Sequence, residues 1–158
     1  MSAWEQSGKS DEWYTPKYIF DALGVVFDLD VAAPADGTRH VPCKSFIFEG
    51  SLDSDWSGFV WMNSPFGGRN GLAPWLKKFC DHGNGIALVP DRTSAPWFQQ
   101  FAPRCDLLLF ISPKVKFERP DGSVGGSPGS GTCLLAVGAQ GTQALIRAKH
   151  LGLLVRAQ

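Results

Sequence analysis

Residues 58–68 read GFVWMNSPFGG, a short apolar run that stops abruptly at an amide, a proline and two glycines. The run from Gly58 to Met62 is apolar and rich in aromatic side chains, as is typical of a strand buried on both faces. Asn63 and Pro65 are turn-forming residue types, so the strand must end where they begin. This stretch predicts a buried strand that delivers polar groups to the edge of a sheet.

Apolar strands and amphipathic helices alternate on both sides of this stretch. We expect strands at 25–33, 46–48, 58–62, 85–89, 106–111, 114–117, 132–138 and 153–156, and helices at 16–23, 72–82, 94–105 and 141–150. We expect Thr15 and Ser94 to cap helices, and Gly24 and Gly83 to end them. The remainder, above all 34–57 and 118–131, should be mostly loop. This alternation predicts an α/β fold with a largely parallel sheet and a hairpin at its end.

Length and composition fit one folded domain. The chain has 158 residues, of which 44% are hydrophobic and 12% aromatic, and this excludes a disordered protein. We expect residues 1–10 to form a flexible lead-in and residues 11–158 to form the domain. Fifteen basic and fifteen acidic side chains give a formal net charge of zero. Any contact with a polyanion must therefore come from a local basic patch.

The cysteines and histidines show no metal-ligand spacing. The four cysteines lie at 43, 80, 105 and 133 without a CxxC pair, and the three histidines are equally scattered. We therefore expect neither a metal site nor a disulfide framework. No apolar stretch approaches the roughly 20 residues of a membrane span, and the polar start has no signal-peptide core. The sequence predicts a cytoplasmic protein without a membrane association.

The tetrapeptide Asn63-Ser64-Pro65-Phe66 carries the chemistry that the chain suggests most clearly. An exocyclic amino group on a heterocycle is a poor nucleophile, because its lone pair is delocalised into the ring. Oxygen acceptors on its hydrogens make it more reactive, and the Asn63 amide oxygen and the Ser64 carbonyl are two such acceptors. Pro65 would fix the turn, and Phe66 would stack on a flipped base. Methyl transfer from a sulfonium to that nitrogen is a direct in-line displacement, which requires orientation and no metal.

The tetrapeptide resembles the (D/N/S)PP(Y/F/W) motif of amino-group DNA methyltransferases. The order of segments around it resembles the small phage and prophage Dam-type DNA N6-adenine methyltransferase family over roughly residues 11–138. The matching segments are DEWYTP at 11–16, FDLDVAA at 27–33, Trp56, WMNSPFG at 61–67, LVPDRT at 88–93, Trp97-Phe98, and KVKF at 114–117.

The resemblance implies a single-domain Rossmann-like S-adenosylmethionine-dependent methyltransferase fold, reduced in size, that methylates N6 of adenine in DNA. Asp30, at a strand end, would hold the ribose hydroxyls of S-adenosylmethionine. The other cofactor-binding residues implied are Trp13, Thr15, Pro16, Ala32 and Ala33. Two features depart from the common pattern: Ser64 stands where the motif usually has its first proline, and the chain has no glycine-rich FxGxG loop.

Three basic residues are candidates for contact with the DNA backbone. Lys114 and Lys116 alternate on an expected short strand and so share one face, and Arg92 follows another strand. The chain has no room for a separate target-recognition domain. We therefore expect short or relaxed sequence specificity, read by loops 34–57, 67–71 and 118–131. The resemblance also implies a phage setting, in which methylated DNA evades host restriction inside the host cytoplasm.

Other readings of the same residues remain open at this point. Cytosine N4 or a protein glutamine amide presents a similar planar amino group to Asn63 and Phe66. A non-catalytic nucleic-acid-binding module is another reading, suggested by Ser64, and a protein-interaction module with exposed aromatic residues is a third. The sequence leaves the recognition site and the oligomeric state undetermined.

Overall fold

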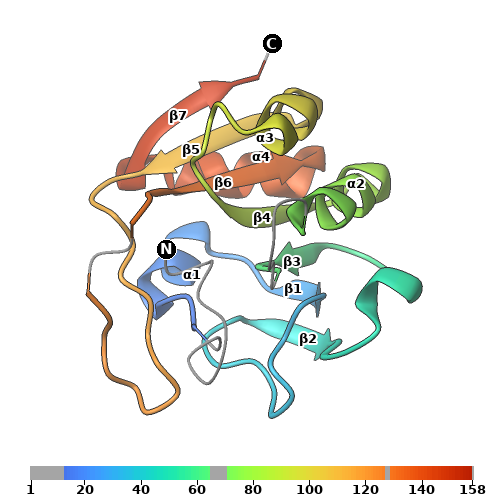
Figure 1. The fold of residues 1–158 in the computed structure, drawn as a ribbon, viewed down its shortest axis with the longest axis vertical. Coiled ribbons are helices and arrows are strands. Elements are labelled where there is room, and N and C mark those ends of the chain that lie inside the picture. The colour runs from blue at the N-terminus through green and yellow to red at the C-terminus, as the bar shows by residue number, and fades with distance from the viewer. Residues whose placement is uncertain (1–12, 65–70, 127–128, 158) are drawn as a thin grey trace.

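The strands of the described chain form one sheet in the order β2-β1-β3-β4-β6-β5-β7 (Figure 1). The computed structural model describes residues 13–64, 71–126 and 129–157. The strands are β1 Phe27–Asp30, β2 Cys43–Phe46, β3 Val60–Met62, β4 Gly85–Pro90, β5 Leu107–Ile111, β6 Thr132–Val137 and β7 Gly152–Arg156. The helices are α1 Lys17–Leu23, α2 Leu72–His82, α3 Pro96–Phe101 and α4 Gly138–Arg147, with 3-10 turns at Ser51–Asp53, Ala102–Arg104 and Lys149–Leu151.

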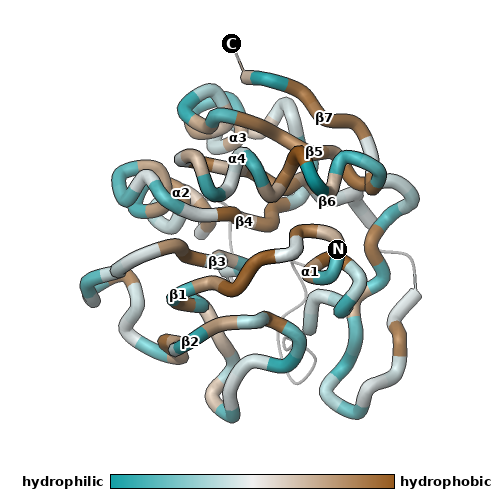
Figure 2. The backbone as a smooth tube through the Cα atoms, turned by 180° about the vertical axis from the view of Figure 1, so that it is seen from behind, coloured by the Kyte–Doolittle hydropathy of each residue, from teal (hydrophilic) through white to brown (hydrophobic). Residues whose placement is uncertain are grey.

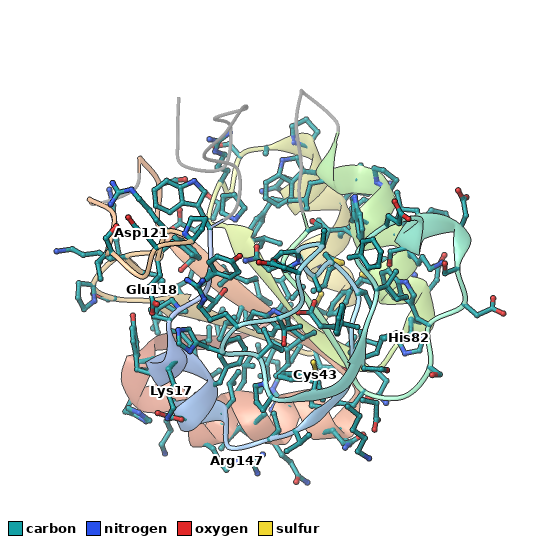
Figure 3. The ribbon with its side chains drawn as sticks, turned by 90° about the horizontal axis from the view of Figure 1, so that it is seen from below. Lys17, Cys43, His82, Glu118, Asp121 and Arg147 are labelled. Carbon is teal, nitrogen blue, oxygen red and sulfur yellow. The ribbon has the colours of Figure 1, made fainter. Side chains whose placement is uncertain are left out.

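Helices cover the sheet on both faces. Helices α2 and α3 pack together on one face, and α1 and α4 pack together on the other (Figure 1). Arg147 of α4 donates from Nε to the carbonyl of Leu23 at the end of α1, over 3.0 Å (Figure 3). The domain is therefore a three-layered α/β/α structure, as the alternation of strands and helices predicts.

The central strands are apolar on both sides because each side meets a helical layer. In β4, Ile86 and Leu88 belong to the core under α1 and α4, whereas Ala87 and Val89 belong to the core under α2 and α3. All four side chains are fully buried. Figure 2 shows the hydrophobic colour running along β4 and β5. Such continuous apolar runs are what a sheet covered on both faces requires.

The sheet is mixed, and the expectation of a largely parallel sheet was wrong. Strands β1 to β4 are parallel neighbours, but β6 lies antiparallel between β4 and β5, and β7 is antiparallel to β5. The last two strands, β6 and β7, are not neighbours, so the expected terminal hairpin is absent from the described chain. The described residues of the long connection 112–131 contain no helix, and β6 begins at the same end of the sheet at which β5 ends.

Several local expectations also differ from the structure. Residues 114–117 form no strand, and the short strand expected at 46–48 lies at β2 instead. Neither Thr15 nor Ser94 caps a helix: α1 and α3 are preceded by Pro16 and Ala95, without a side-chain cap. The expected stops are confirmed, because Gly24 and Gly83 adopt left-handed conformations with φ of 66° and 77°.

The order of the strands in the sheet reverses between β1 and β3. After β1 the chain moves outward to β2, and after β3 it moves the other way to β4. Strands β1 and β3 are nevertheless neighbours, with Asp30 paired to Trp61. At such a switch point the loops that follow the two strands diverge and leave a crevice at the carboxyl ends, where α/β proteins bind ligands.

Candidate functional site

Asp30 ends β1 at the switch point and is almost completely buried, with 3% of its surface exposed. Its Oδ1 accepts a hydrogen bond from the backbone amide of Ala32 at 3.1 Å. Burial raises the pKa of this carboxyl to about 7, and the Ala32 hydrogen bond opposes the rise. No other hydrogen-bond donor to this carboxylate occurs among the described residues, so Asp30 retains acceptor capacity for a ligand.

The turn after Asp30 is held by the backbone of its neighbours. The amide of Val31 donates to the carbonyl of Trp61 at 3.0 Å, and the amide of Ala33 donates to the carbonyl of Ile47 at 3.0 Å. Val31 is fully buried, and Ala33 is 7% exposed. This segment is therefore anchored to β3 and to the chain after β2, which fixes the direction of Asp30.

Asn63 follows β3, two residues beyond the strand partner of Asp30. Its Nδ2 donates a hydrogen bond to Oγ1 of Thr15 at 3.2 Å. Thr15 is buried, so the contact joins the end of β3 to the segment that leads into α1. Because Nδ2 faces Thr15, the amide oxygen of Asn63 points away from Thr15, and it accepts no hydrogen bond from the residues that the structure describes.

Ser64 is 3% exposed, and its hydroxyl has no hydrogen-bond partner among the described residues. A buried hydroxyl that lacks a partner costs free energy in the folded state. Pro65 and Phe66, the other two residues of the predicted motif, lie outside the described residues.

The segment Trp13-Tyr14-Thr15-Pro16 is bound to the long connection after β5. The backbones of Tyr14 and Glu118 exchange two hydrogen bonds of 2.8 and 3.0 Å. The ring of Trp13 lies against Gly125, where an added Cβ would come within 2.6 Å of it. The indole Nε1 of Trp13 is buried and has no partner within the part of the chain that the structure describes.

Four polar residues hold this segment, and we call this set the clasp: Arg39, His40, Glu118 and Arg119. Arg39 donates to the carbonyls of Arg119 and Pro120 at 2.9 and 2.6 Å, and its guanidinium lies 4.1 Å from the centre of the Tyr14 ring. His40 Nε2 lies 3.0 Å from Glu118 Oε1 (Glu118 is labelled in Figure 3), and the Arg119 guanidinium lies 5.4 Å from the Trp13 ring. The clasp thus joins three segments that are distant in sequence.

The three basic residues expected to contact DNA lie on segments that follow β4 and β5, at the edge of the sheet that also carries Asp30 and Asn63. Arg92 follows β4 and is half-buried. Lys114 and Lys116 are exposed, whereas Val115 and Phe117 between and after them are buried in the core. The segment is extended without being a strand, so both lysines still project to the same side.

Three tryptophans in the segments that resemble the family differ in their surroundings. Trp61 is 1% exposed and packs edge-on against Phe20 with ring centres 4.8 Å apart, so it is a core residue. Trp56 is also buried, and its Nε1 donates to Ser51. Trp97 is half-buried beside Phe98.

Sequence reasoning missed the clasp altogether. Arg39 and Arg119 are 80 residues apart, and neither carries a local pattern that points to the other. Only the acidic and basic residues flanking two loops could have suggested a contact between them.

The described residues contain no group of three or more His, Cys, Asp or Glu side chains placed to hold a metal ion. In the ranges described, no helix is long and apolar enough to cross a bilayer.

A three-layered α/β/α domain, with a buried carboxyl at the end of β1 and an asparagine directly after the neighbouring strand β3, is compatible with a small Rossmann-like methyltransferase fold. A sequence model of the DNA N-6-adenine-methyltransferase (Dam) family matches residues 3–138, and the chain therefore belongs to this family. It is an adenine-specific DNA methyltransferase, and its family uses S-adenosylmethionine in general. No curated protein and no solved structure matches the chain.

Proposed function

We propose that this protein transfers a methyl group from S-adenosylmethionine to N6 of an adenine flipped out of DNA, by direct in-line displacement at the carboxyl ends of β1 and β3. The observation that carries the proposal is the hydrogen bond from Asn63 Nδ2 to Thr15 beside the switch point, which turns the Asn63 amide oxygen away from Thr15. An acceptor fixed in this way can take one hydrogen of the adenine amino group.

The groups that follow Asn63 complete the proposed capture of the base. The backbone carbonyl of Ser64 would accept the second N6 hydrogen, which draws electron density onto the nitrogen. Pro65 and Phe66 would fix the turn and stack on the adenine ring, and these two roles rest on the family resemblance. Since the Ser64 carbonyl acts through the backbone, a serine in place of the motif's usual proline keeps this acceptor.

Asp30 is suited to the ribose of S-adenosylmethionine. Its buried carboxyl accepts one hydrogen bond from Ala32 and has further acceptor capacity, and a ribose offers two neighbouring hydroxyl donors. Trp13, with its unpartnered indole nitrogen, and Thr15, Pro16, Ala32 and Ala33 would line the remainder of the cofactor site. When bound, S-adenosylmethionine supplies an electrophilic methyl group on a positive sulfur.

Arg92, Lys114 and Lys116 would contact phosphates beside the flipped base. They lie on segments that follow β4 and β5, at the edge that carries Asp30 and Asn63. Phosphate contacts of this kind orient the DNA without reading its sequence. A neutral chain with a local basic patch should bind DNA weakly outside its target site.

The test is nucleoside analysis by mass spectrometry after incubation of the purified protein with S-adenosylmethionine and unmethylated DNA. We expect N6-methyladenine from the wild-type protein and none from Asn63→Ala, with cofactor binding nearly unchanged in calorimetry. Asn84→Ala is the matched control, because Asn84 precedes β4 at the opposite edge of the sheet. N4-methylcytosine without N6-methyladenine would overturn the base assignment, and DNA binding without cofactor affinity would favour a non-catalytic module.

A further inference from the structure

Two cysteine side chains meet between α2 and the start of β5, away from the proposed site. Cys80 lies near the end of α2, and Cys105 lies two residues before β5. Both thiols point at the carbonyl of Phe101, with sulfur-to-oxygen distances of 3.9 and 3.6 Å. The fold therefore brings a pair of thiols together from segments 25 residues apart.

The two thiols differ in access and in charge. Cys80 is half-buried, and the interaction with the Cys105 side chain and the nearby Arg104 guanidinium lower its pKa. Arg104 is held in place by Asp81, at 2.8 Å. Cys105 is buried, and its interaction with the Cys80 side chain, together with burial, raises its pKa. A more acidic, accessible thiol is the better nucleophile of such a pair.

We propose that Cys80 and Cys105 are a redox-active pair, which a low-molecular-weight disulfide such as oxidised glutathione converts into an intramolecular disulfide. The Cys80 thiolate attacks one sulfur of oxidised glutathione, the glutathione S–S bond breaks, and one glutathione leaves and takes up a proton. Cys105 then loses its proton and attacks the Cys80 sulfur of the mixed disulfide, which releases the second glutathione as a thiol. Two protein thiols are oxidised, and one glutathione disulfide is reduced.

The second step joins two sulfurs that already face one acceptor, the carbonyl of Phe101. The new bond would join the end of α2 to the start of β5. These positions lie at the amino edge of β4 and β5, opposite Asp30 and Asn63. Oxidation should therefore tighten the α2 and α3 layer without reaching the methyl-transfer groups.

The other two cysteines serve as internal comparisons. Cys43 is half-buried on β2, on the far side of β1, and Cys133 is fully buried in β6, where its thiol donates to the Leu134 carbonyl. Neither thiol shares its acceptor with another cysteine within the described parts of the chain. Cys43 should take up at most a single glutathione, and Cys133 should remain reduced.

The experiment equilibrates the full-length protein with mixtures of reduced and oxidised glutathione, blocks the remaining thiols by alkylation, and measures intact mass and peptides. We expect two of the four thiols to disappear together, with the loss of two hydrogens and a peptide cross-linked between Cys80 and Cys105. Cys105→Ser should trap a glutathione adduct on Cys80, Cys80→Ser should form no cross-link, and Cys43→Ser should behave as the wild-type protein. Four free thiols in fully oxidising buffer, or a cross-link that survives in Cys80→Ser, would overturn the proposal.

Discussion

The amide of Asn63 donates to the hydroxyl of Thr15 over 3.2 Å, and this contact joins the end of β3 to the chain that enters α1. The two residues are 48 positions apart, yet they lie at one edge of the sheet. The orientation of the Asn63 amide therefore depends on a residue from a different part of the chain.

Replacement of Thr15 should reduce turnover without removing the acceptor. Thr15→Val keeps the volume of the buried side chain but removes the oxygen that holds Nδ2 of Asn63, so the amide can rotate. Loss of one hydrogen bond of about 1 kcal/mol corresponds to a roughly five- to tenfold lower kcat. Single-turnover methylation measures this change. Thr142→Val on α4, whose hydroxyl bonds only within its helix, should leave the rate unchanged.

The buried Asp30 carboxyl should make stability depend on pH. Its pKa is about 7 in the folded protein, above the ordinary value of 3.8, so the folded state binds this proton more tightly than the unfolded state. The free energy of unfolding should therefore fall as pH rises from about 4 to about 7, with a slope of at most about 1.4 kcal/mol per pH unit from this group. Urea unfolding across that range is the measurement, and Asp30→Asn should remove the contribution.

The same group should link cofactor affinity to pH. The ionised carboxylate is the stronger acceptor for ribose hydroxyls, so binding of S-adenosylmethionine should strengthen as pH rises from 6 to 8. Calorimetric affinities in Asp30→Asn should be weaker and flat over this range. An equally steep pH dependence in that variant would contradict the assignment of Asp30.

Removal of the Ser64 hydroxyl should stabilise the protein. Ser64→Ala eliminates a buried oxygen that lacks a partner among the described residues and keeps the backbone carbonyl. We expect the free energy of unfolding to rise by roughly 1 kcal/mol, with methylation retained. Ser51→Ala should instead lower the free energy of unfolding, because the Ser51 hydroxyl accepts a hydrogen bond from Trp56 at 2.9 Å. A destabilised, inactive Ser64→Ala would show that the hydroxyl itself has a function.

Loss of Arg39 should weaken cofactor binding. Arg39→Ala breaks both hydrogen bonds to the 119–120 carbonyls and the contact with the Tyr14 ring, which frees the segment carrying Trp13 and Thr15. We expect KM for S-adenosylmethionine to rise about tenfold with a smaller change in kcat, since the clasp does not touch the reacting atoms. Arg156→Ala on β7 is a matched change outside the clasp and should have no effect.

Replacement of Lys114 and Lys116 together should reduce the salt dependence of DNA binding. If each lysine contacts one phosphate, the slope of log affinity against log salt should fall by about 1.8 in the double alanine variant. Fluorescence anisotropy with a labelled duplex at several salt concentrations measures this slope. The double variant of Lys17 and Lys77, two exposed lysines on α1 and α2, should leave it unchanged.

Elements governed by local patterns could be predicted from the sequence, and contacts between distant segments could not. The helix at 72–82 has the predicted bounds, because the spacing of Leu72, Leu76 and Phe79 and the stop at Gly83 are local signals. The placement of β6 between β4 and β5 depends on pairing across the sheet, which no local pattern encodes. Thr15 was expected at a helix cap, but a buried tertiary contact with Asn63 uses its hydroxyl instead.

The candidate site was predictable to the same extent. Asp30 and Asn63 were placed at strand ends from sequence, and the β1 and β3 pairing brings those ends together. The partners that orient them, such as the Ala32 amide and Thr15, required the three-dimensional arrangement. The clasp was beyond prediction because its members come from two loops.

The antiparallel course of β6 has a consequence for how such an enzyme can acquire new targets. Since β5 ends and β6 begins at the same margin of the sheet, the connection between them needs no crossover helix, and beyond the buried Val115 and Phe117 its stretch 120–124 is exposed. Extending it would leave the interior packing untouched, and doubling its length would cost only about 0.6 kcal/mol in closure entropy. Evolution or engineering can therefore graft additional nucleotide-reading modules at this position while the transferase scaffold stays unaltered.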